Sequence, residues 1–246
     1  RAKFTVRSLK VILLFFLFLT WYSAYYNKVT DCGCFGDAIK LTPWQSFYKD
    51  VFLTILIFFI GTKIRFIKPI TRTLLPGKLV ITSIIISALI TFYTLAHLPI
   101  IDFRAYAVGK NIPEGMQYKD DGEIPPIHDF MLENSQNDLS PQILKMNKVM
   151  LVIMSSLEKS DFKAFPNVKK AAENAIKKGY KVYGVSASFS DIIQLTKKKF
   201  NLPFEVLFCD ETTLKTMIRA NPGIMILNKG TIVDKKSWSD IDDLEL

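Results

Sequence analysis

The sequence predicts a membrane α-helical bundle followed by an α/β domain with a mixed sheet. Three observations support this fold class. Three apolar runs lie within the first 101 of 246 residues. From residue 149 onward, segments typical of strands alternate with segments typical of helices. The net charge of +9 comes entirely from residues 1–97, which contain 12 Lys and Arg against 3 Asp and Glu, because residues 98–246 contain 20 of each kind.

The charge distribution and the cysteine content exclude two other classes. A basic chain can bind nucleic acid through a basic face. Here, however, the excess charge flanks apolar runs and the C-terminal part is neutral. We therefore predict no nucleic-acid partner. Three cysteines are also too few for a small scaffold held together by disulfides.

The apolar runs predict transmembrane helices at about residues 8–27, 43–62 and 78–99. A helix needs about 20 residues to cross the hydrocarbon core. The third run reaches this length without a charge, and the first two reach it with their flanks. None of the runs has a polar face, which argues against buried helices of a soluble protein. The second helix should begin at Pro43, because Thr42 and Gln45 form a capping-box pattern around it.

Basic residues predict the orientation of these helices. Positively charged loops stay in the cytoplasm, and the two basic segments are the N-terminal flank and the loop after the second run. The C-terminal part is therefore expected outside the cytoplasm. The loop between the first two runs is expected on the same outer side. The three positive charges of this loop are offset by three negative ones: Lys28, Lys40 and Lys49 against Asp31, Asp37 and Asp50.

A Cys-Gly-Cys turn in this outer loop is the sharpest chemical feature of the chain. Cys32 and Cys34 are candidate catalytic residues, because a disulfide across one residue is strained and easily reduced. The neighbouring Asp31 and Asp37 oppose this role, since carboxylates raise the pKa of a nearby thiol. A static turn, with or without a disulfide, is the alternative. A metal site would need two more ligands, so no metal is predicted.

The rest of the chain divides into a linker and a domain. Residues 102–126 are rich in Pro, Gly and charge and are expected to be a linker between a membrane region at 1–101 and a domain at 127–246. The order βαβαβαββ, ending in a hairpin, indicates an α/β fold with a mixed sheet. Strands are predicted at residues 149–154, 181–186, 204–209, 223–227 and 231–235, and helices at 166–178, 190–199 and 212–219.

The C-terminal domain resembles the thioredoxin-like domains of membrane-anchored thiol reductases (TlpA type) and peroxiredoxins. The resemblance rests on residues 129–132, on the strand at 149–154 and on Asn221-Pro222 before the last hairpin. It implies that Pro222 is cis and faces the active site. The family's redox Cys-x-x-Cys follows the first core strand, where this chain has Ser-Ser-Leu-Glu-Lys at 155–159. The resemblance therefore implies a redox-inactive domain whose Ser155, Ser156, Asn221 and Pro222 bind a substrate or partner.

The third cysteine, Cys209, ends the third predicted core strand. A free cysteine in that place is most often a small buried hydrophobic residue, and we expect this of Cys209.

The membrane region resembles the DoxX/MauE group of bacterial inner-membrane proteins. The residues that carry this are DCGCFGD at 31–37 and LTPW at 41–44, with further agreement at 97–104, 111–116, 210–215 and 221–223. The resemblance implies an inner-membrane protein with a periplasmic C-terminal domain and a redox-linked role. It also implies that a quinone is a possible cofactor in that role. Only the second half of the group's four-helix core is present, together with the connecting helix. We therefore expect residues to be missing before Arg1 and near residues 117–125.

Two functions remain open. In the first, the protein is a thiol-disulfide or quinone-linked redox module, an oxidoreductase in which Cys32 and Cys34 exchange with a substrate that the outer domain binds. In the second, it is a non-catalytic, membrane-anchored assembly subunit of an envelope protein complex. The Cys-Gly-Cys turn favours the first, and the missing Cys-x-x-Cys favours the second. In both, the expected partners are the lipid bilayer and an envelope protein.

Overall fold

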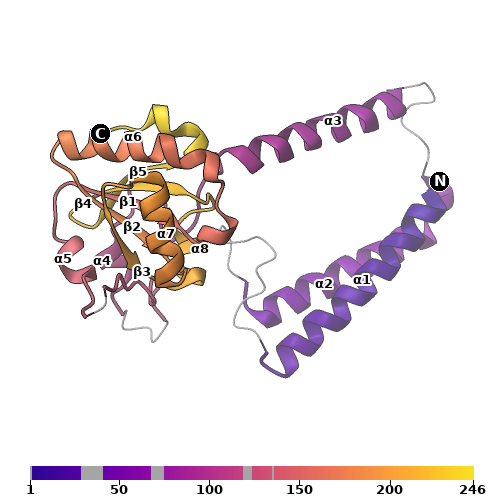
Figure 1. Cartoon of the computed structure of the whole chain (residues 1–246). Helices are drawn as coiled ribbons and strands as arrows, with labels where there is room; N and C mark the ends of the chain where they lie inside the picture. Colours follow the sequence, from indigo (N-terminus) through magenta and orange to yellow (C-terminus); the bar gives the residue numbers. More distant parts are fainter. Residues whose placement is uncertain (1, 29–40, 68–74, 119–123, 135) are drawn as a thin grey trace. The chain divides into compact units, whose positions relative to one another are not determined.

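The computed structural model describes residues 2–28, 41–67, 75–118, 124–134 and 136–246 (Figure 1). The chain forms two compact units, Arg1–Ile84 and Ile85–Leu246, which are described one at a time.

The first unit is built on a helix pair. Helices α1 (Ala2–Tyr25) and α2 (Pro43–Thr62) pack against each other along their lengths (Figure 1). The capping box at the start of α2 is confirmed, because Thr42 Oγ1 accepts from the Gln45 backbone N–H at 3.3 Å and Gln45 Oε1 accepts from the Thr42 backbone N–H at 3.0 Å. A short 3₁₀ turn, η1 (Ile64–Phe66), follows α2.

Among the described residues, three helices are long and apolar enough to cross a membrane: α1, α2 and the Gly77–Ala96 part of α3 (Leu75–Ala96). Their positions agree with the predicted runs, although α1 begins at Ala2 rather than near residue 8. Most of their large apolar side chains are exposed to the surroundings, as expected of helices whose solvent is lipid.

Lys49 and Asp50 lie inside α2, in agreement with the helix predicted at residues 43–62. Their charges therefore do not belong to the outer loop, to which the charge count assigned them. Asp50 is buried against α1, where its carboxylate accepts a hydrogen bond from Thr20 Oγ1 at 3.1 Å. Lys49 Nζ lies 3.4 Å from the other carboxylate oxygen. A buried carboxylate between apolar helices needs such partners, because lipid supplies none.

The second unit contains a five-stranded sheet of order β3-β2-β1-β4-β5. Strand β1 pairs in parallel with β2, and β2 pairs in parallel with β3. Strand β4 pairs antiparallel with β1 on one side and with β5 on the other. This is the mixed sheet and the thioredoxin-like arrangement that the sequence predicts. The strands are β1 (Val149–Met154), β2 (Lys181–Ser186), β3 (Glu205–Phe208), β4 (Gly223–Asn228) and β5 (Thr231–Ser237).

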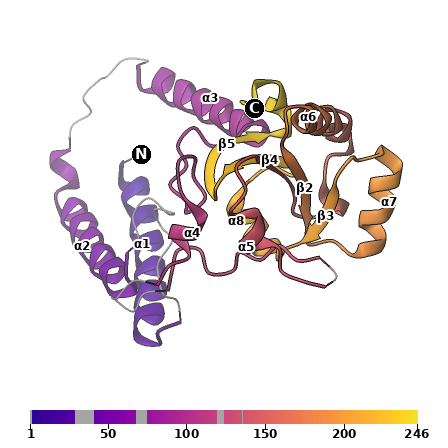
Figure 2. The same cartoon turned by 90° about the vertical axis from the view of Figure 1, so that its left-hand side faces the viewer.

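Helices cover both faces of this sheet, so that β1 is buried on both sides (Figure 2). On one face, α6 (Phe165–Lys177) and α7 (Ser190–Phe200) pack on Met150, Val152 and Met154. On the other face, α8 (Glu211–Met217) packs with the segment before β1 on the alternate β1 residues. A strand buried on both faces reads as an unbroken apolar run, which is why β1 was evident in the sequence.

The stretch expected as a linker contributes to the second core. Tyr106 and Ile112 are buried among the residues of that core. The Gly109 backbone N–H donates to Ile232 O at 2.8 Å, and the Ile112 N–H donates to Gly230 O at 2.9 Å, so this stretch lies along the β4–β5 hairpin. Short helices α4 (Ile112–Gly115) and α5 (Ser140–Ile143) belong to the same layer. The 3₁₀ turns are η2 (Leu157–Lys159), η3 (Phe162–Ala164) and η4 (Trp238–Asp243).

Candidate functional site

The polar residues singled out from the sequence meet at one edge of the sheet. Ser155 and Ser156 directly follow β1, whereas Asn221 and Pro222 directly precede β4. Because β4 runs antiparallel to β1, with Gly223 opposite Ile153, its first residues lie beside the last residues of β1. In open α/β sheets this edge, at the carboxyl ends of the parallel strands, is where ligands commonly bind.

Asn221 links the two loops at this edge. The Asn221–Pro222 peptide bond is cis, as the resemblance implies. The Asn221 side-chain amide donates to Ser156 O at 2.7 Å. The Ser160 hydroxyl lies 2.9 Å from both Asn221 Oδ1 and Ser156 O and can donate to either. Ser155 and Pro222 are buried, whereas Ser156 and Asn221 are half-buried.

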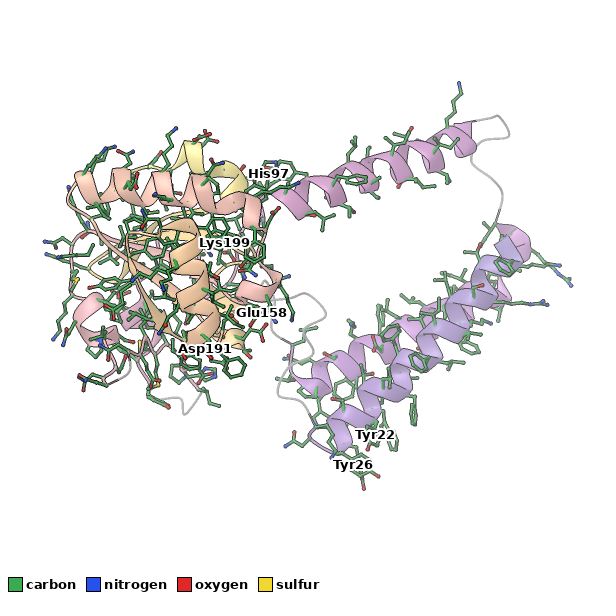
Figure 3. All side chains as sticks on the ribbon, viewed as in Figure 1. Tyr22, Tyr26, His97, Glu158, Asp191 and Lys199 are labelled. Carbon is green, nitrogen blue, oxygen red and sulfur yellow. The ribbon has the colours of Figure 1, made fainter. Side chains whose placement is uncertain are left out.

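A carboxylate lies in the loop after β1, where the resemblance to thioredoxin-like domains implies the position of the family's cysteine pair. Glu158, on η2, accepts hydrogen bonds from Ser156 Oγ at 2.7 Å and from Ser188 Oγ at 2.9 Å (Figure 3). The hydrogen bonds from Ser156, from the backbone and from Ser188 lower the pKa of Glu158, and its side chain is exposed. This edge therefore carries a negative charge at neutral pH. We call Ser156, Glu158, Ser188, Asn221 and Pro222 the cis-proline site.

Sequence reasoning missed Glu158 and Ser188 as members of this site. Ser188 follows β2, and its hydroxyl also accepts from the Leu157 backbone N–H at 2.9 Å, so one side chain from the β2–α7 loop fixes the η2 turn. Glu158 stands within the segment that replaces the cysteine pair, and this position was the signal that could have identified it. No local pattern marks Ser188, because its partners are about 30 residues away.

Around the site the surface is mixed in character. Phe189, which directly follows Ser188, is 81% exposed. Lys159 Nζ lies 4.0 Å from Glu211 Oε1, and Lys215 Nζ lies 2.7 Å from the same oxygen.

The cysteines divide between described and undescribed parts of the chain. Cys32 and Cys34 lie outside the described residues. Cys209 follows β3 and is 1% exposed, as expected for a small buried hydrophobic residue. Burial raises the pKa of its thiol to about 11, so it stays protonated and unreactive at neutral pH. Within the part of the chain that the structure describes, the cis-proline site thus contains hydroxyl, amide and carboxylate groups but no thiol.

Metal-binding groups and hollows among the described residues bear on what the cis-proline site can hold. Among the described residues, no three His, Cys, Asp or Glu side chains lie close enough together to hold a metal ion. An apolar hollow of about 620 Å³ lies elsewhere on the domain, with Met116, Phe130 and Leu144 among its lining residues. Its lining includes none of the five residues of the cis-proline site, so the two features are separate.

A family model matches the N-terminal part of the chain. A model of the family described as methylamine utilisation protein MauE matches residues 3–63. None of the curated proteins compared with the chain is a significant match.

Solved structures that resemble the chain include three bacterial proteins. A thiol:disulfide interchange protein from Bacteroides sp. is 17% identical, with coverage of 47% of this chain and 82% of that one and a TM-score of 0.37. The thioredoxin domain of a thiol-disulfide oxidoreductase from Bacteroides vulgatus is 18% identical, with coverage of 52% and 87% and a TM-score of 0.38. StoA from Bacillus subtilis is 20% identical, with coverage of 44% and 86% and a TM-score of 0.34.

The assignment of the C-terminal domain as thioredoxin-like rests on the strand order of its sheet and on the cis-proline before β4. Residues 3–63 match the MauE family model, and the chain is a membrane protein that joins this region to a thioredoxin-like domain.

Proposed function

We propose that the protein is a redox-linked protein of the bacterial inner membrane whose thioredoxin-like domain lies in the periplasm. Cys32 and Cys34 exchange disulfides with an envelope protein, and the thioredoxin-like domain binds that protein without taking part in the exchange. One observation carries the proposal. The cis-proline site keeps Asn221 and Pro222 locked against Ser156, but it presents serines and Glu158 where a redox domain carries thiols.

The groups of the cis-proline site suit binding better than exchange. Hydroxyl and amide groups donate to and accept from the backbone of an extended peptide. A fixed carboxylate raises the pKa of any substrate thiol brought beside it, which slows attack by that thiol on a disulfide. The buried Cys209 thiol supplies no nucleophile. The cysteines of a bound substrate therefore keep their oxidation state until they meet a reactive cysteine pair elsewhere in the protein.

The second pair in this proposal is Cys32 and Cys34. A substrate thiolate attacks one sulfur of the Cys32–Cys34 disulfide, a mixed disulfide forms, and the second substrate thiol resolves it. The substrate gains a disulfide, and Cys32 and Cys34 are left as two thiols that have received two electrons and two protons. A quinone in the bilayer is the class of two-electron acceptor that would restore the Cys32–Cys34 disulfide.

Thiol trapping in intact cells tests this proposal. Cells are quenched with acid, free thiols are alkylated with a maleimide–polyethylene glycol, and the chain is detected by immunoblotting. We expect the wild type to be largely bridged at Cys32–Cys34, and Cys32→Ser or Cys34→Ser to accumulate adducts that dithiothreitol dissolves. The matched control is Cys209→Ser, which should behave as the wild type. Absence of adducts in both single variants would reject exchange by this pair.

A non-catalytic assembly subunit is the second candidate, favoured by the absence of a reactive thiol among the described residues of the cis-proline site. It predicts that Cys32→Ser/Cys34→Ser retains normal co-purification with envelope partners, whereas Asn221→Ala reduces it. Under the redox proposal both variants lose function, but only Asn221→Ala loses affinity for the partner. The function of Cys32→Ser/Cys34→Ser in cells therefore separates the two candidates. The redox proposal expects it to be lost, and the assembly role expects it to be retained.

A further inference from the structure

The segment that follows α3 has an inverted polarity. Its apolar side chains point outward, since Ile100 is 84%, Ile101 65% and Phe103 60% exposed. Its charged side chains Asp102 and Arg104 point inward, and Arg104 is buried. On a surface that faces water the opposite arrangement is expected. We call Ile100, Ile101 and Phe103 the apolar foot of the domain.

Hydrogen bonds fix this inverted arrangement. Asp102 accepts from Arg104 Nε at 2.9 Å and from Lys235 Nζ at 2.8 Å, and the Lys235 side chain is only 4% exposed. Arg104 also donates to Thr216 O at 3.0 Å, and Lys235 donates to Tyr106 O at 2.8 Å. Turning the foot inward would break these bonds and leave buried charges without partners. The exposure of the foot is therefore built into the fold.

The foot lies close to the end of a candidate membrane span. Helix α3 ends at Ala96, whose carbonyl accepts a hydrogen bond from Ser239 Oγ. His97 Nδ1 lies 2.6 Å from Asp240 Oδ1, so the end of α3 is held against η4 (Figure 3). Ile100 comes only four residues after Ala96, which limits its distance from the helix end to about 14 Å.

We propose that the apolar foot inserts into the membrane interface at the end of α3, so that the thioredoxin-like domain rests on the lipid surface. The polar headgroup layer on each side of the hydrocarbon core is about 5–8 Å thick. Ile100, at most about 14 Å from the end of α3, therefore lies within reach of the boundary between headgroups and acyl chains, and Ile101 and Phe103 follow it in the chain. We assign lipid, rather than a second protein, as the partner of the apolar foot, because the foot directly continues the candidate membrane span α3. This inference does not depend on the proposed redox function.

Depth-dependent quenching of a fluorophore tests the proposal. The full chain is placed in lipid nanodiscs with an environment-sensitive fluorescent amino acid at Ile101, introduced by an expanded genetic code. The matched control carries the same fluorophore at Phe189, which is 81% exposed but directly precedes α7. Phospholipids brominated near the top of the acyl chain should quench the fluorophore at Ile101 at least threefold more than at Phe189. Its emission should also shift to shorter wavelength.

Two results would overturn the proposal. Equal quenching at both positions would show that the foot lies in water. A shift to shorter wavelength at Ile101 without quenching by brominated lipid would show that protein, such as a second copy of the chain, covers the foot instead.

Discussion

Lys235 Nζ lies 2.8 Å from Asp102 Oδ2 and joins β5 to the segment that follows α3. We predict that Asp102→Asn destabilises the thioredoxin-like domain by about 3–5 kcal/mol, because it leaves the buried charges of Lys235 and Arg104 without their carboxylate. Urea unfolding of the full chain in detergent, followed by Trp238 fluorescence, measures this. Asp243→Asn, at an exposed aspartate, is the control and should change stability by no more than about 0.5 kcal/mol. Equal stabilities of the two variants would contradict the prediction.

The same contact predicts how the stability of the domain depends on pH. Burial raises the pKa of Asp102, but the hydrogen bonds from Arg104 and Lys235 outweigh it and hold the pKa well below its usual range. Burial also lowers the pKa of Lys235, against the opposing effect of Asp102. A lowered carboxyl pKa stabilises the fold above the unfolded-state pKa of about 3.9, and this contribution is lost as the pH falls toward the folded-state pKa.

The urea midpoints of wild type and Asp102→Asn should therefore converge as the pH falls below about 4 and differ fully at pH 6. A difference that stays constant from pH 6 to pH 3 would show that the carboxylate charge is not the stabilising feature.

Ser188 should control the order of the η2 turn. Its hydroxyl accepts from the Leu157 N–H and donates to Glu158, so Ser188→Ala leaves a buried N–H without a partner. We expect a local cost of about 1 kcal/mol, which corresponds to roughly fivefold faster hydrogen exchange at the Leu157 amide. Hydrogen exchange of the full chain measured by mass spectrometry tests this. Ser190→Ala, at an exposed serine, should leave this exchange unchanged, and an unchanged rate in Ser188→Ala would refute the role.

Cys209 should resist alkylation while the domain is folded. Its pKa of about 11, against an ordinary value of 9.0, lowers the thiolate fraction at pH 8 about 100-fold, and its side chain is buried. The test is an iodoacetamide pulse on Cys32→Ser/Cys34→Ser, read by mass spectrometry with and without urea. An added Ser190→Cys substitution gives the exposed reference thiol. Labelling of Cys209 as fast as that reference in the folded protein would contradict the burial.

Thr20 should strengthen the pairing of α1 with α2. Its hydroxyl lies 3.1 Å from the buried Asp50 carboxylate and 3.0 Å from Phe16 O in its own helix, and it can donate to either. Thr20→Val should lower the stability of the pair by about 0.6 kcal/mol, the average for such bonds in membranes. Unfolding in mixtures of dodecyl sulfate and mild detergent, followed by Trp21 and Trp44 fluorescence in a Trp238→Phe background, measures this. Thr91→Val is the control, because the Thr91 hydroxyl bonds only to its own helix at Ser87 O. A loss no larger than that of the control would refute the prediction.

Local patterns account for the part of the fold that could be predicted. The unbroken apolar run of β1 follows from burial on both faces, and the start of α2 follows from the pairing of Thr42 with Gln45 three residues later. Pro222 was placed through the family resemblance, and its cis bond is confirmed. The apolar run and the capping box each involve residues close together in the sequence, so both can be recognised without knowledge of the fold.

Contacts between distant residues account for the rest. Asp50 meets Thr20 across 30 positions, and Asp102 meets Lys235 across 133, so neither pair leaves a periodic signal. Residues 102–118 resemble a linker in composition, yet hydrogen bonds to the β4–β5 hairpin order part of them. Ser155, Ser156, Asn221 and Pro222 were predicted together through the resemblance to thioredoxin-like domains. Ser188 and Glu158 join them only through the folded loops.

The central claim is that binding and exchange are separated, with binding at the cis-proline site and exchange at Cys32 and Cys34. The most direct measurement is the yield of dithiothreitol-sensitive adducts of Cys34→Ser in acid-quenched cells, compared with Cys34→Ser/Asn221→Ala and with Cys32→Ser/Cys34→Ser. The account predicts abundant adducts in the first variant, several-fold fewer in the second at equal protein level, and none in the third. Adducts that persist in Cys32→Ser/Cys34→Ser and disappear in Cys209→Ser would contradict it.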